Sequence, residues 1–288
     1  GKLAGLGIAG LVLFSVANDA ASAGEPPAMD GLTIARAILD REESAATQRI
    51  IRMTLTTHKG RTNERQAIVQ KIIDAQWRAT RITFLSPKKY RAMAFLSHDY
   101  RDTASSDNRW MYLPAAKRVR SIPSARRGNA FFGTDFSYED IQSELKFREE
   151  DWQFEFAGNT DVGGEMRLRL QGKARDKRVA RELGYSSFEA LIDPQSWMPR
   201  RIDFIDVRGR ALKRIDVIAV KQVDGVWTPV EIIAVNHQSG HRTRFVFEHT
   251  RHGLSFSRAL FEPRDLGRRL ADSHLAGAST ATAGQGVE

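Results

Sequence analysis

The chain has 288 residues, 41% hydrophobic and 27% charged, with 22 Gly, 9 Pro and a formal net charge of +9 at pH 7, a composition that excludes collagen-like, coiled-coil and wholly disordered chains. It contains no Cys, which excludes thiolate catalysis, cysteine-bound zinc and iron–sulfur clusters. The positive charge favours anionic partners.

The first predicted element is an export signal. Lys2 precedes an apolar run over residues 3–16, and Ala-Ser-Ala at 21–23 has the small-x-small pattern that signal peptidase cleaves. The run is shorter than the roughly 20 residues that span a bilayer. We therefore expect a signal peptide over residues 1–23 and a periplasmic mature chain. In that compartment anionic membrane headgroups are a more accessible partner than nucleic acid, and membrane contact is expected to be peripheral.

A helix is predicted just after residue 30, because apolar residues recur there at one-face spacing. These residues are Leu32, Ala35, Ile38 and Leu39. Asp30 or Thr33 is expected to cap the start of this helix.

From Ile50 onward apolar and polar residues alternate, and this period of two predicts β-strands. The alternating positions are Ile51, Met53 and Leu55, then Ala67, Val69 and Lys71, then Ile82 and Phe84. The turn dipeptides are Lys59-Gly60, Ser86-Pro87, Arg208-Gly209, Asp224-Gly225 and Ser239-Gly240. Many strands joined by short turns predict an antiparallel meander rather than βαβ units.

Two further helices are expected among the strands. The segment 137–140, Ser-Tyr-Glu-Asp, is typical of a capped helix start with acids in the first turn. Residues 174–183 form a charged helical segment that ends at Gly184, a natural C-cap. Residues 271–288 are of low complexity and are predicted to be disordered, so that residues 24–270 form a single domain.

No catalytic motif stands out. The sequence has no Gly-x-Ser-x-Gly elbow, no His-Glu-x-x-His and no Gly-x-x-x-x-Gly-Lys phosphate loop. His237 and His241 are separated by a Ser-Gly turn, which favours exposed turn histidines over a metal site. An alternative hypothesis is an enzyme that acts on lipids or glycans and uses Asp135 and Asp140 as a pair of catalytic carboxylates. Structural roles also explain these two residues, a turn for Asp135 and a helix cap for Asp140. We predict no enzymatic activity, no metal and no cofactor.

The least common features lie in the segment 108–141. Arg-Trp-Met-Tyr-Leu-Pro at 109–114 precedes a basic stretch and then a predicted long loop with Phe131, Phe132 and Phe136. Solvent-facing loops seldom hold three aromatic rings. The rings either plug one end of the sheet as ordinary core or line an apolar groove.

Two blocks of this segment follow the pattern of a known family. Trp-Met-Tyr-Leu-Pro at 110–114 and Phe-Phe-Gly-Thr-Asp-Phe-Ser-Tyr-Glu-Asp at 131–140 are similar to Trp-Leu-Tyr-Leu-Pro and Phe-Met-Gly-Ser-Asp-Phe-Ser-Tyr-Glu-Asp-Leu of LolA-like, outer-membrane lipoprotein-sorting proteins. Shorter matches are Phe-Leu-x-Pro at 84–87, Asp-Gly-Val-Trp at 224–227 and Phe-x-Pro at 261–263. The resemblance spans about residues 33–267.

The resemblance implies a mainly β fold: an incomplete, strongly curved antiparallel β-barrel with helices covering its concave face and an apolar cavity inside. It also implies a periplasmic carrier that binds acyl chains of a lipoprotein or lipid and passes them between membranes or membrane proteins. The alternative is a lipid-sensing accessory subunit of an RND/MMPL-type inner-membrane transporter. The protein partner of such an accessory subunit would be the transporter, whereas the protein partner of a carrier would be an outer-membrane acceptor.

Candidate ligand contacts are the apolar positions of the strands and the aromatic loop. They are Met53, Ile82, Phe84, Met93, Phe95, Trp110, Tyr112, Phe131, Phe132 and Phe136. Which sheet face lines the cavity stays open, and plain core packing is the other explanation for these positions. The basic cluster that could contact phosphate headgroups or an acidic partner, or be a solvated surface, consists of Lys117, Arg118, Arg120, Arg126 and Arg127.

Overall fold

The computed structural model describes residues 29–100 and 107–270. The predicted signal peptide and the predicted disordered tail lie outside the described residues. The strands are β1 (Ala46–Thr56), β2 (Thr62–Ile73), β3 (Trp77–Ser86), β4 (Ala94–Tyr100), β5 (Asn108–Leu113), β6 (Arg118–Ser121), β7 (Trp152–Val162), β8 (Glu165–Ala174), β9 (Tyr185–Ile192), β10 (Pro199–Asp206), β11 (Ala211–Val223), β12 (Val226–Asn236) and β13 (Arg242–His252). The α-helices are α1 (Gly31–Leu39), α2 (Tyr138–Ser143) and α3 (Lys177–Leu183). Short 3-10 turns are η1 (Pro114–Ala116), η2 (Ser124–Arg126), η3 (Phe131–Gly133), η4 (Arg258–Phe261) and η5 (Pro263–Asp265).

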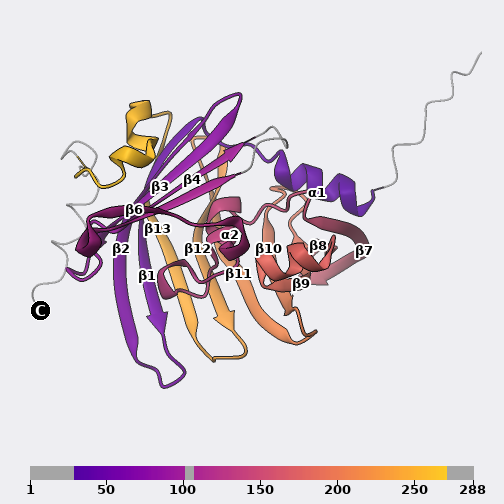
Figure 1. The fold of residues 1–288 in the computed structure, drawn as a ribbon. Helices are drawn as coiled ribbons and strands as arrows, with labels where there is room; N and C mark the ends of the chain where they lie inside the picture. The colour runs from indigo at the N-terminus through magenta and orange to yellow at the C-terminus, as the bar shows by residue number, and fades with distance from the viewer. Residues whose placement is uncertain (1–28, 101–106, 271–288) are drawn as a thin grey trace, which may run out of the picture.

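In the described part of the chain, all thirteen strands form one sheet in the order β6-β5-β4-β3-β2-β1-β13-β12-β11-β10-β9-β8-β7. Every neighbouring pair is antiparallel. The sheet curves strongly (Figure 1), and its two edges, β6 and β7, are not joined to each other. This confirms the predicted incomplete, curved, mainly β architecture.

The predicted strands and turns are confirmed, but burial alternates as predicted only on β1, because both faces of β2 and β3 are largely buried. On β1, Ile51, Met53 and Leu55 are all buried, while the residues between them are partly exposed. Four of the five turn dipeptides connect consecutive strands, as between β11 and β12, where Asp224-Gly225 forms the turn. Gly225 has φ +82°, a left-handed conformation that glycine adopts without a steric penalty.

The helices begin and end at the capping residues that the sequence indicates. Asp30, rather than Thr33, caps α1 and accepts a hydrogen bond from the Thr33 backbone N–H at 2.7 Å. At α2 the side chains of Ser137 and Asp140 each accept a hydrogen bond from the other's backbone N–H, which is a capping box. Helix α3 ends at Gly184 as predicted but starts later than expected, because residue 174 still belongs to β8.

The main hydrophobic core lies inside the curve of the sheet. Helix α2 lies in front of the middle strands, with α1 and α3 beside β7 to β9 (Figure 1). The segment 131–147 contributes fully or nearly buried apolar side chains such as Phe131, Phe136 and Phe147 to this core. The predicted helical cover of the concave side is thus made of short helices together with the connecting segment around α2.

The opposite face of β3 to β5 is covered by the C-terminal segment, residues 256–270. Its Phe261 and Leu266 are buried with Trp77 and Leu96 in a second cluster. Arg81, 1% exposed, reaches into this segment and donates hydrogen bonds to several of its backbone carbonyls. Both faces of this part of the sheet are therefore buried.

None of the helices among the described residues has the length and apolarity needed to span a membrane.

Candidate functional site

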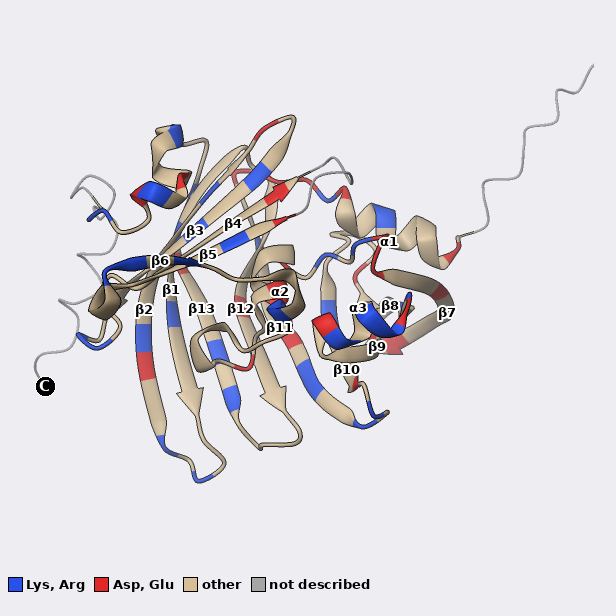
Figure 2. Cartoon of the chain, in the orientation of Figure 1, with Lys and Arg blue, Asp and Glu red and all other residues tan. Residues whose placement is uncertain are grey.

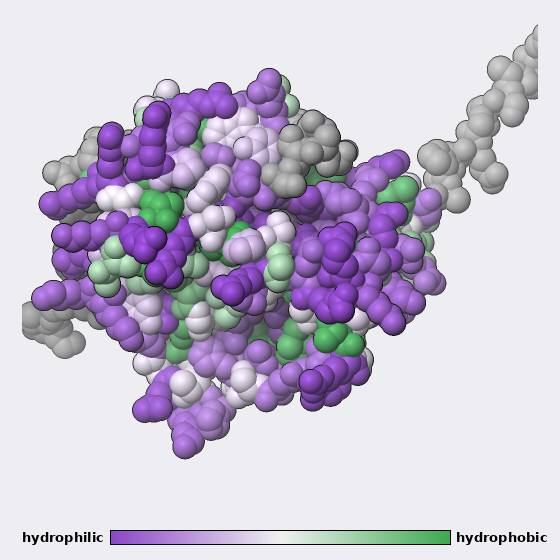
Figure 3. All heavy atoms as spheres, in the orientation of Figure 1, coloured by the Kyte–Doolittle hydropathy of each residue, from purple (hydrophilic) through white to green (hydrophobic). Residues whose placement is uncertain are grey.

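A cleft lies between the sheet and α2. One wall comes from β1, β2, β3, β12 and β13, and the other from residues 41–44 and from α2 with the two residues after it. Its cavity volume is only about 90 Å³, below the roughly 300 Å³ at which small-molecule sites begin, so the cleft is nearly closed in this conformation. The molecular face in Figure 3 is mostly hydrophilic, with hydrophobic residues in small patches between polar ones.

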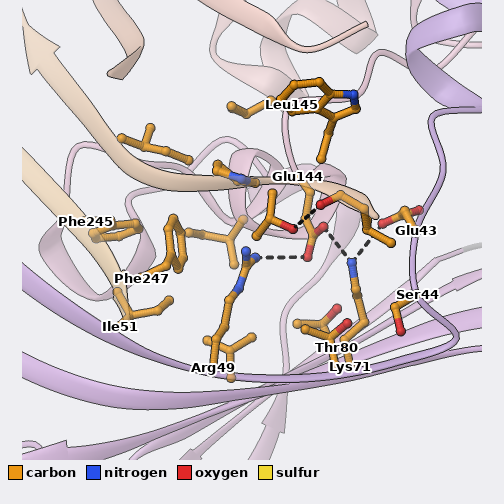
Figure 4. A pocket seen from close by; sticks show the side chains of 18 of the residues that line it. Glu43, Ser44, Arg49, Ile51, Lys71, Thr80, Glu144, Leu145, Phe245 and Phe247 are labelled. Atoms are coloured by element: carbon orange, nitrogen blue, oxygen red, sulfur yellow. Dashed lines mark hydrogen bonds and ion pairs between the residues drawn. The ribbon is translucent and has the colours of Figure 1, made fainter. Parts of the chain in front are cut away.

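One end of the cleft is apolar. Phe245 and Phe247 project from the same side of β13, and the ring of Phe136 stacks on Phe245 with the ring centroids 4.3 Å apart. Ile51 of β1 pairs with Phe247, and Leu145 closes the space from the α2 side (Figure 4). Aromatic and aliphatic side chains from two layers thus face one another at this end of the cleft.

The other end of the cleft is ionic. Glu144 lies 3.5 Å from Arg49 and 2.8 Å from Lys71, and Lys71 also binds Glu43 at 2.8 Å (Figure 4). Lys146 binds the second carboxylate oxygen of Glu43 at 2.6 Å. Arg49 joins the two ends, because its guanidinium lies 4.1 Å from the centroid of the Phe247 ring.

Burial and charge set the protonation of this ionic end. Burial alone would raise the pKa of Glu144, but the charges of Lys71 and Arg49 outweigh it and lower this pKa to about 2. Burial lowers the pKa of Lys146 to about 8, although Glu43 opposes the change. Burial also lowers the pKa of Arg49. Glu144 is therefore a carboxylate throughout the physiological range, and the cations beside it are incompletely compensated.

The backbone after α2 is strained where it meets the cleft. Glu144 and Leu145 have φ values of +50° and +63°, and two consecutive non-glycine residues in the left-handed region are unfavourable. The two ion pairs of Glu144 and the burial of Leu145 hold this conformation. One side chain of the strained pair thus enters the ionic end and the next enters the apolar end.

The structure divides the predicted ligand contacts among three places. Ile82 and Phe136 line the cleft. Six others lie in the main core or pack against it, outside the cleft wall: Met53, Phe84, Met93, Phe95, Phe131 and Phe132. Trp110 and Tyr112 pack in the second cluster on the opposite face of the sheet. The aromatic loop thus contributes to both the hydrophobic core and the cleft, because Phe131 is fully buried and Phe136 lines the cleft.

Four members of the basic cluster form an exposed surface on β6 and the turns around it. They are Lys117, Arg118, Arg120 and Arg126. Basic residues concentrate on the edge strand β6 (Figure 2), where Arg118 and Arg120 alternate with Val119 and Ser121. Arg127 does not belong to this surface, contrary to the prediction. It is 5% exposed, because its guanidinium makes two 2.6 Å hydrogen bonds to Asp151 and also approaches Glu139 and Glu182.

Asp135 and Asp140, the two carboxylates considered for catalysis, bind different partners. Asp135 Oδ2 lies 2.6 Å from His241 Nδ1 and accepts a hydrogen bond from Thr243 Oγ1 at 2.7 Å. Asp140 caps α2, accepts a hydrogen bond from the Tyr185 hydroxyl at 3.1 Å and pairs with Lys213. Each aspartate thus fastens the segment around α2 to a different strand.

Sequence reasoning missed the charged end of the cleft. Arg49 and Lys71 occupy inward positions of the strand alternation, two residues before Ile51 and two after Val69. A charged residue at a core-facing position is unusual unless it is paired or functional. That signal was present in the sequence. The partner carboxylates Glu43 and Glu144, however, lie in connections between helices and strands, where no hydrophobic periodicity indicates which way a side chain points.

Comparison with known proteins identifies similar families and folds. A family model described as an uncharacterized protein matches residues 77–268, which is more than half of the chain. No protein with a curated description matches the sequence. A crystal structure of a candidate outer membrane lipoprotein-sorting protein domain from Vibrio parahaemolyticus is 26% identical, with a TM-score of 0.73, and the match covers 83% of this chain and 98% of that domain.

Two further solved structures share the fold at lower identity. A DUF1329 family protein from Desulfovibrio piger is 22% identical, with a TM-score of 0.75 and coverage of 82% of this chain and 97% of that chain. A LolA superfamily protein from Nitrosomonas europaea is 14% identical, with a TM-score of 0.62 and coverage of 82% and 98%. The curved sheet with its cover over the concave face is thus an architecture shared along nearly the full length of these proteins.

Proposed function

The chain belongs to the family of uncharacterized proteins whose model matches residues 77–268, and it shares the fold of lipoprotein-sorting and LolA superfamily proteins; on this premise we propose that it is an exported carrier of acylated molecules. It binds an acyl chain of a lipoprotein or lipid in the cleft beside α2 and passes it between membranes or membrane proteins. The observation that carries the proposal is the cleft itself, whose apolar end is walled by Phe136, Phe245 and Phe247.

A carrier is needed because acyl chains do not cross water unaided. Exposing a chain costs about 0.8 kcal/mol per CH₂, so a sixteen-carbon chain costs roughly 12 kcal/mol. The cleft offsets this cost by replacing the hydrocarbon surroundings with aromatic and aliphatic side chains. Its sheet wall presents no unpaired backbone groups there, because β1 and β13 are hydrogen-bonded to each other and to their other neighbours.

Entry of a chain requires the two walls to separate. Phe136 and Phe245 stack at 4.3 Å, which leaves no room for a methylene chain between the rings. The wall that moves is the segment around α2, because α2 has only six residues whereas the sheet wall is held by continuous strand pairing. A carrier must also release its cargo, and a cleft that closes on itself favours release.

The exposed basic surface of β6 supplies the contact with the donor or acceptor membrane in this proposal. Arg118 and Arg120 project from an edge strand, and Lys117 and Arg126 flank it. Each basic residue near an anionic bilayer contributes about 1 kcal/mol, so a group of four is enough for reversible peripheral contact.

The test is whether lipid accompanies the protein. Purified chain is denatured, its organic extract is analysed by mass spectrometry, and transfer of a pyrene-labelled phospholipid between vesicles is followed by fluorescence. We expect acylated molecules in the extract and transfer that increases with protein concentration. Leu145→Trp, which fills the apolar end, should reduce both, whereas Leu39→Trp on an exposed position of α1 should not. An extract without lipid together with no transfer would overturn the proposal.

A further inference from the structure

An ion-pair network that starts at the ionic end of the cleft and continues behind its wall holds more cations than carboxylates. Arg78, Lys146 and Asp99 belong to the part behind the wall. The wall itself also carries the exposed Glu42 and Asp140, which pairs with Lys213. Within the described residues, one connected set of ion pairs joins four cations to three carboxylates: Arg49, Lys71, Arg78 and Lys146 with Glu43, Glu144 and Asp99. Arg41 adds a fifth cation on the cleft wall, and it donates hydrogen bonds to the backbone carbonyls of Trp197 at 3.5 Å and Glu144 at 3.3 Å. The set therefore carries a net positive charge.

This positive charge is poorly compensated by the protein itself. Burial lowers the pKa of Arg41, of Arg49 and of Lys146, so for each of them the loss of hydration outweighs the attraction of the nearby carboxylates. Charges in a partly dry site interact much more strongly than they do in water. An added anion would therefore be attracted to this end of the cleft.

The ionic and apolar ends are continuous. The guanidinium of Arg49 lies over the Phe247 ring, and Glu144 and Leu145 are consecutive residues that enter opposite ends (Figure 4). A molecule that occupies the apolar end thus places the group at its terminus beside Arg49 and Lys71. That arrangement suits an amphiphile in which an anion is attached directly to an alkyl or acyl chain.

Glu144 already places a carboxylate between these cations. It does so from a left-handed backbone conformation that is followed by a second one at Leu145, so the carboxylate is held there at a conformational cost. Replacing it by another anion would keep Arg49 and Lys71 paired while letting the chain after α2 relax. Leu145 would then leave the apolar end together with Glu144.

We propose that the cleft selects amphiphiles with an anionic headgroup, a carboxylate or a phosphate, and that the carboxylate of Glu144 holds the place this headgroup takes between Arg49 and Lys71. The inference rests on the proposed carrier function and specifies its ligand class. It also assigns Glu144 as an internal competitor of the ligand, so that ligand binding and the opening of the cleft beside α2 are one event.

The experiment compares four probes on the folded, full chain by isothermal titration calorimetry, below the concentrations at which the probes aggregate. The probes are dodecanoate, dodecyl phosphate, the neutral monododecanoylglycerol and inorganic phosphate. We expect both anionic amphiphiles to bind at least about tenfold more tightly than the neutral one, the order of one charge-assisted contact in a buried site. The difference between dodecanoate and dodecyl phosphate identifies which headgroup is preferred.

The variants separate headgroup recognition from packing. Arg49→Met should remove most of the preference for anionic probes, and Arg41→Met, which breaks no ion pair, is the second variant if Arg49→Met does not fold. Glu144→Gln should tighten binding of the anionic probes several-fold and that of monododecanoylglycerol less, because only the anionic probes gain the contacts with Arg49 and Lys71 that the glutamate gives up. The matched control is Glu149→Gln, at an exposed ion pair with Arg36. Circular dichroism confirms folding of each variant.

The outcomes distinguish this inference from the carrier proposal. Equal affinity for neutral and anionic amphiphiles, or weaker anion binding by Glu144→Gln, overturns the inference while the carrier function stands. Inorganic phosphate binding as tightly as dodecyl phosphate also overturns it, because the site would then recognise a free anion. Failure of all three twelve-carbon probes to bind contradicts the carrier function itself.

Discussion

Oε2 of Glu144 lies 2.8 Å from Nζ of Lys71, which fastens the end of α2 to strand β2. The same lysine binds Glu43 at 2.8 Å, in the connection between α1 and β1. One ammonium group therefore links the sheet to both segments that form the opposite wall of the cleft. The position of that wall depends on a polar contact at one end and on aromatic stacking at the other.

Lys71→Met should destabilise the fold strongly. Lys71 is 7% exposed, and its removal would leave two carboxylates buried without their main cation. Breaking one side of a buried ion pair costs about 3 to 5 kcal/mol. Urea denaturation followed by circular dichroism measures the change. Arg36→Met, which breaks an equally short but exposed pair with Glu149, should cost far less, because solvent screens exposed ion pairs, and equal losses in the two variants would contradict the assignment.

Stability should fall as the pH decreases from about 4.5 to about 2. The pKa of Glu144 is lowered from 4.5 to about 2 in the folded chain, so the unfolded chain binds a proton in this range before the folded chain does. The stabilisation is fully present above pH 4.5 and is lost progressively below it; Glu43, whose pKa is also lowered, contributes in the same direction. Urea denaturation at a series of pH values should show a shallower acid slope for Glu144→Gln. An unchanged slope would refute the role of Glu144.

The strands and turns could be predicted from the sequence because each rests on local patterns. Alternating burial follows the pattern of β1, turn dipeptides separate the later strands, and the Ser137 and Asp140 side chains specify the start of α2. On β2 and β3 the strand type was predicted correctly, although residues on both faces are buried. The family resemblance supplied the curvature, which alternation alone does not determine. These features are repeated or short-range, so a single sequence is sufficient to find them.

The lining of the cleft could not be predicted in the same way. Trp110 and Tyr112 lie on the face of β5 that the C-terminal segment covers, while Met111 packs against the main core from the other face. Because both faces of β5 are buried, the alternation of apolar residues does not indicate which face lines the cleft. Arg49 and Lys71 break the apolar pattern at inward positions, but their function depends on Glu43 and Glu144, which approach from connections far away in the sequence.

Arg81→Met should loosen the C-terminal segment. The buried guanidinium donates hydrogen bonds to the carbonyls of Leu260 at 3.0 Å, Leu266 at 3.2 Å and Arg268 at 3.2 Å. Without it these carbonyls lose their donor in a buried setting, which costs about 1 to 3 kcal/mol each before relaxation. Hydrogen exchange followed by mass spectrometry should accelerate over residues 256–270 but not over β11 and β12.

The control for this variant is Arg91→Met. Arg91 is exposed and donates one hydrogen bond to the carbonyl of Leu85 at 3.2 Å. Its loss should leave exchange over residues 256–270 unchanged. If Arg81→Met also left that exchange unchanged, the second hydrophobic cluster around Phe261 would be sufficient to hold the segment and the arginine would not be its main anchor.

Charge reversal on β6 should weaken binding to anionic membranes. Arg118 and Arg120 are exposed on the edge strand, so Arg118→Glu combined with Arg120→Glu changes the local charge at a solvent-facing surface. Each arginine near an anionic surface contributes about 1 kcal/mol, and the contribution decreases with salt because the Debye length is about 8 Å at physiological ionic strength. Co-sedimentation with phosphatidylglycerol vesicles should therefore decrease at least about tenfold in the double variant.

Lys59→Glu combined with Arg61→Glu provides a control with the same change in net charge. Both residues are exposed in the turn between β1 and β2, on a hairpin that is separate from the edge strand. If binding depends on the β6 surface, this control should retain most of it. An equal decrease in the two double variants would show that the vesicles respond to the net positive charge of the whole chain, and β6 would then not be a specific contact. Phosphatidylcholine vesicles should bind neither the wild type nor the variants, because without anionic lipid the electrostatic attraction is absent.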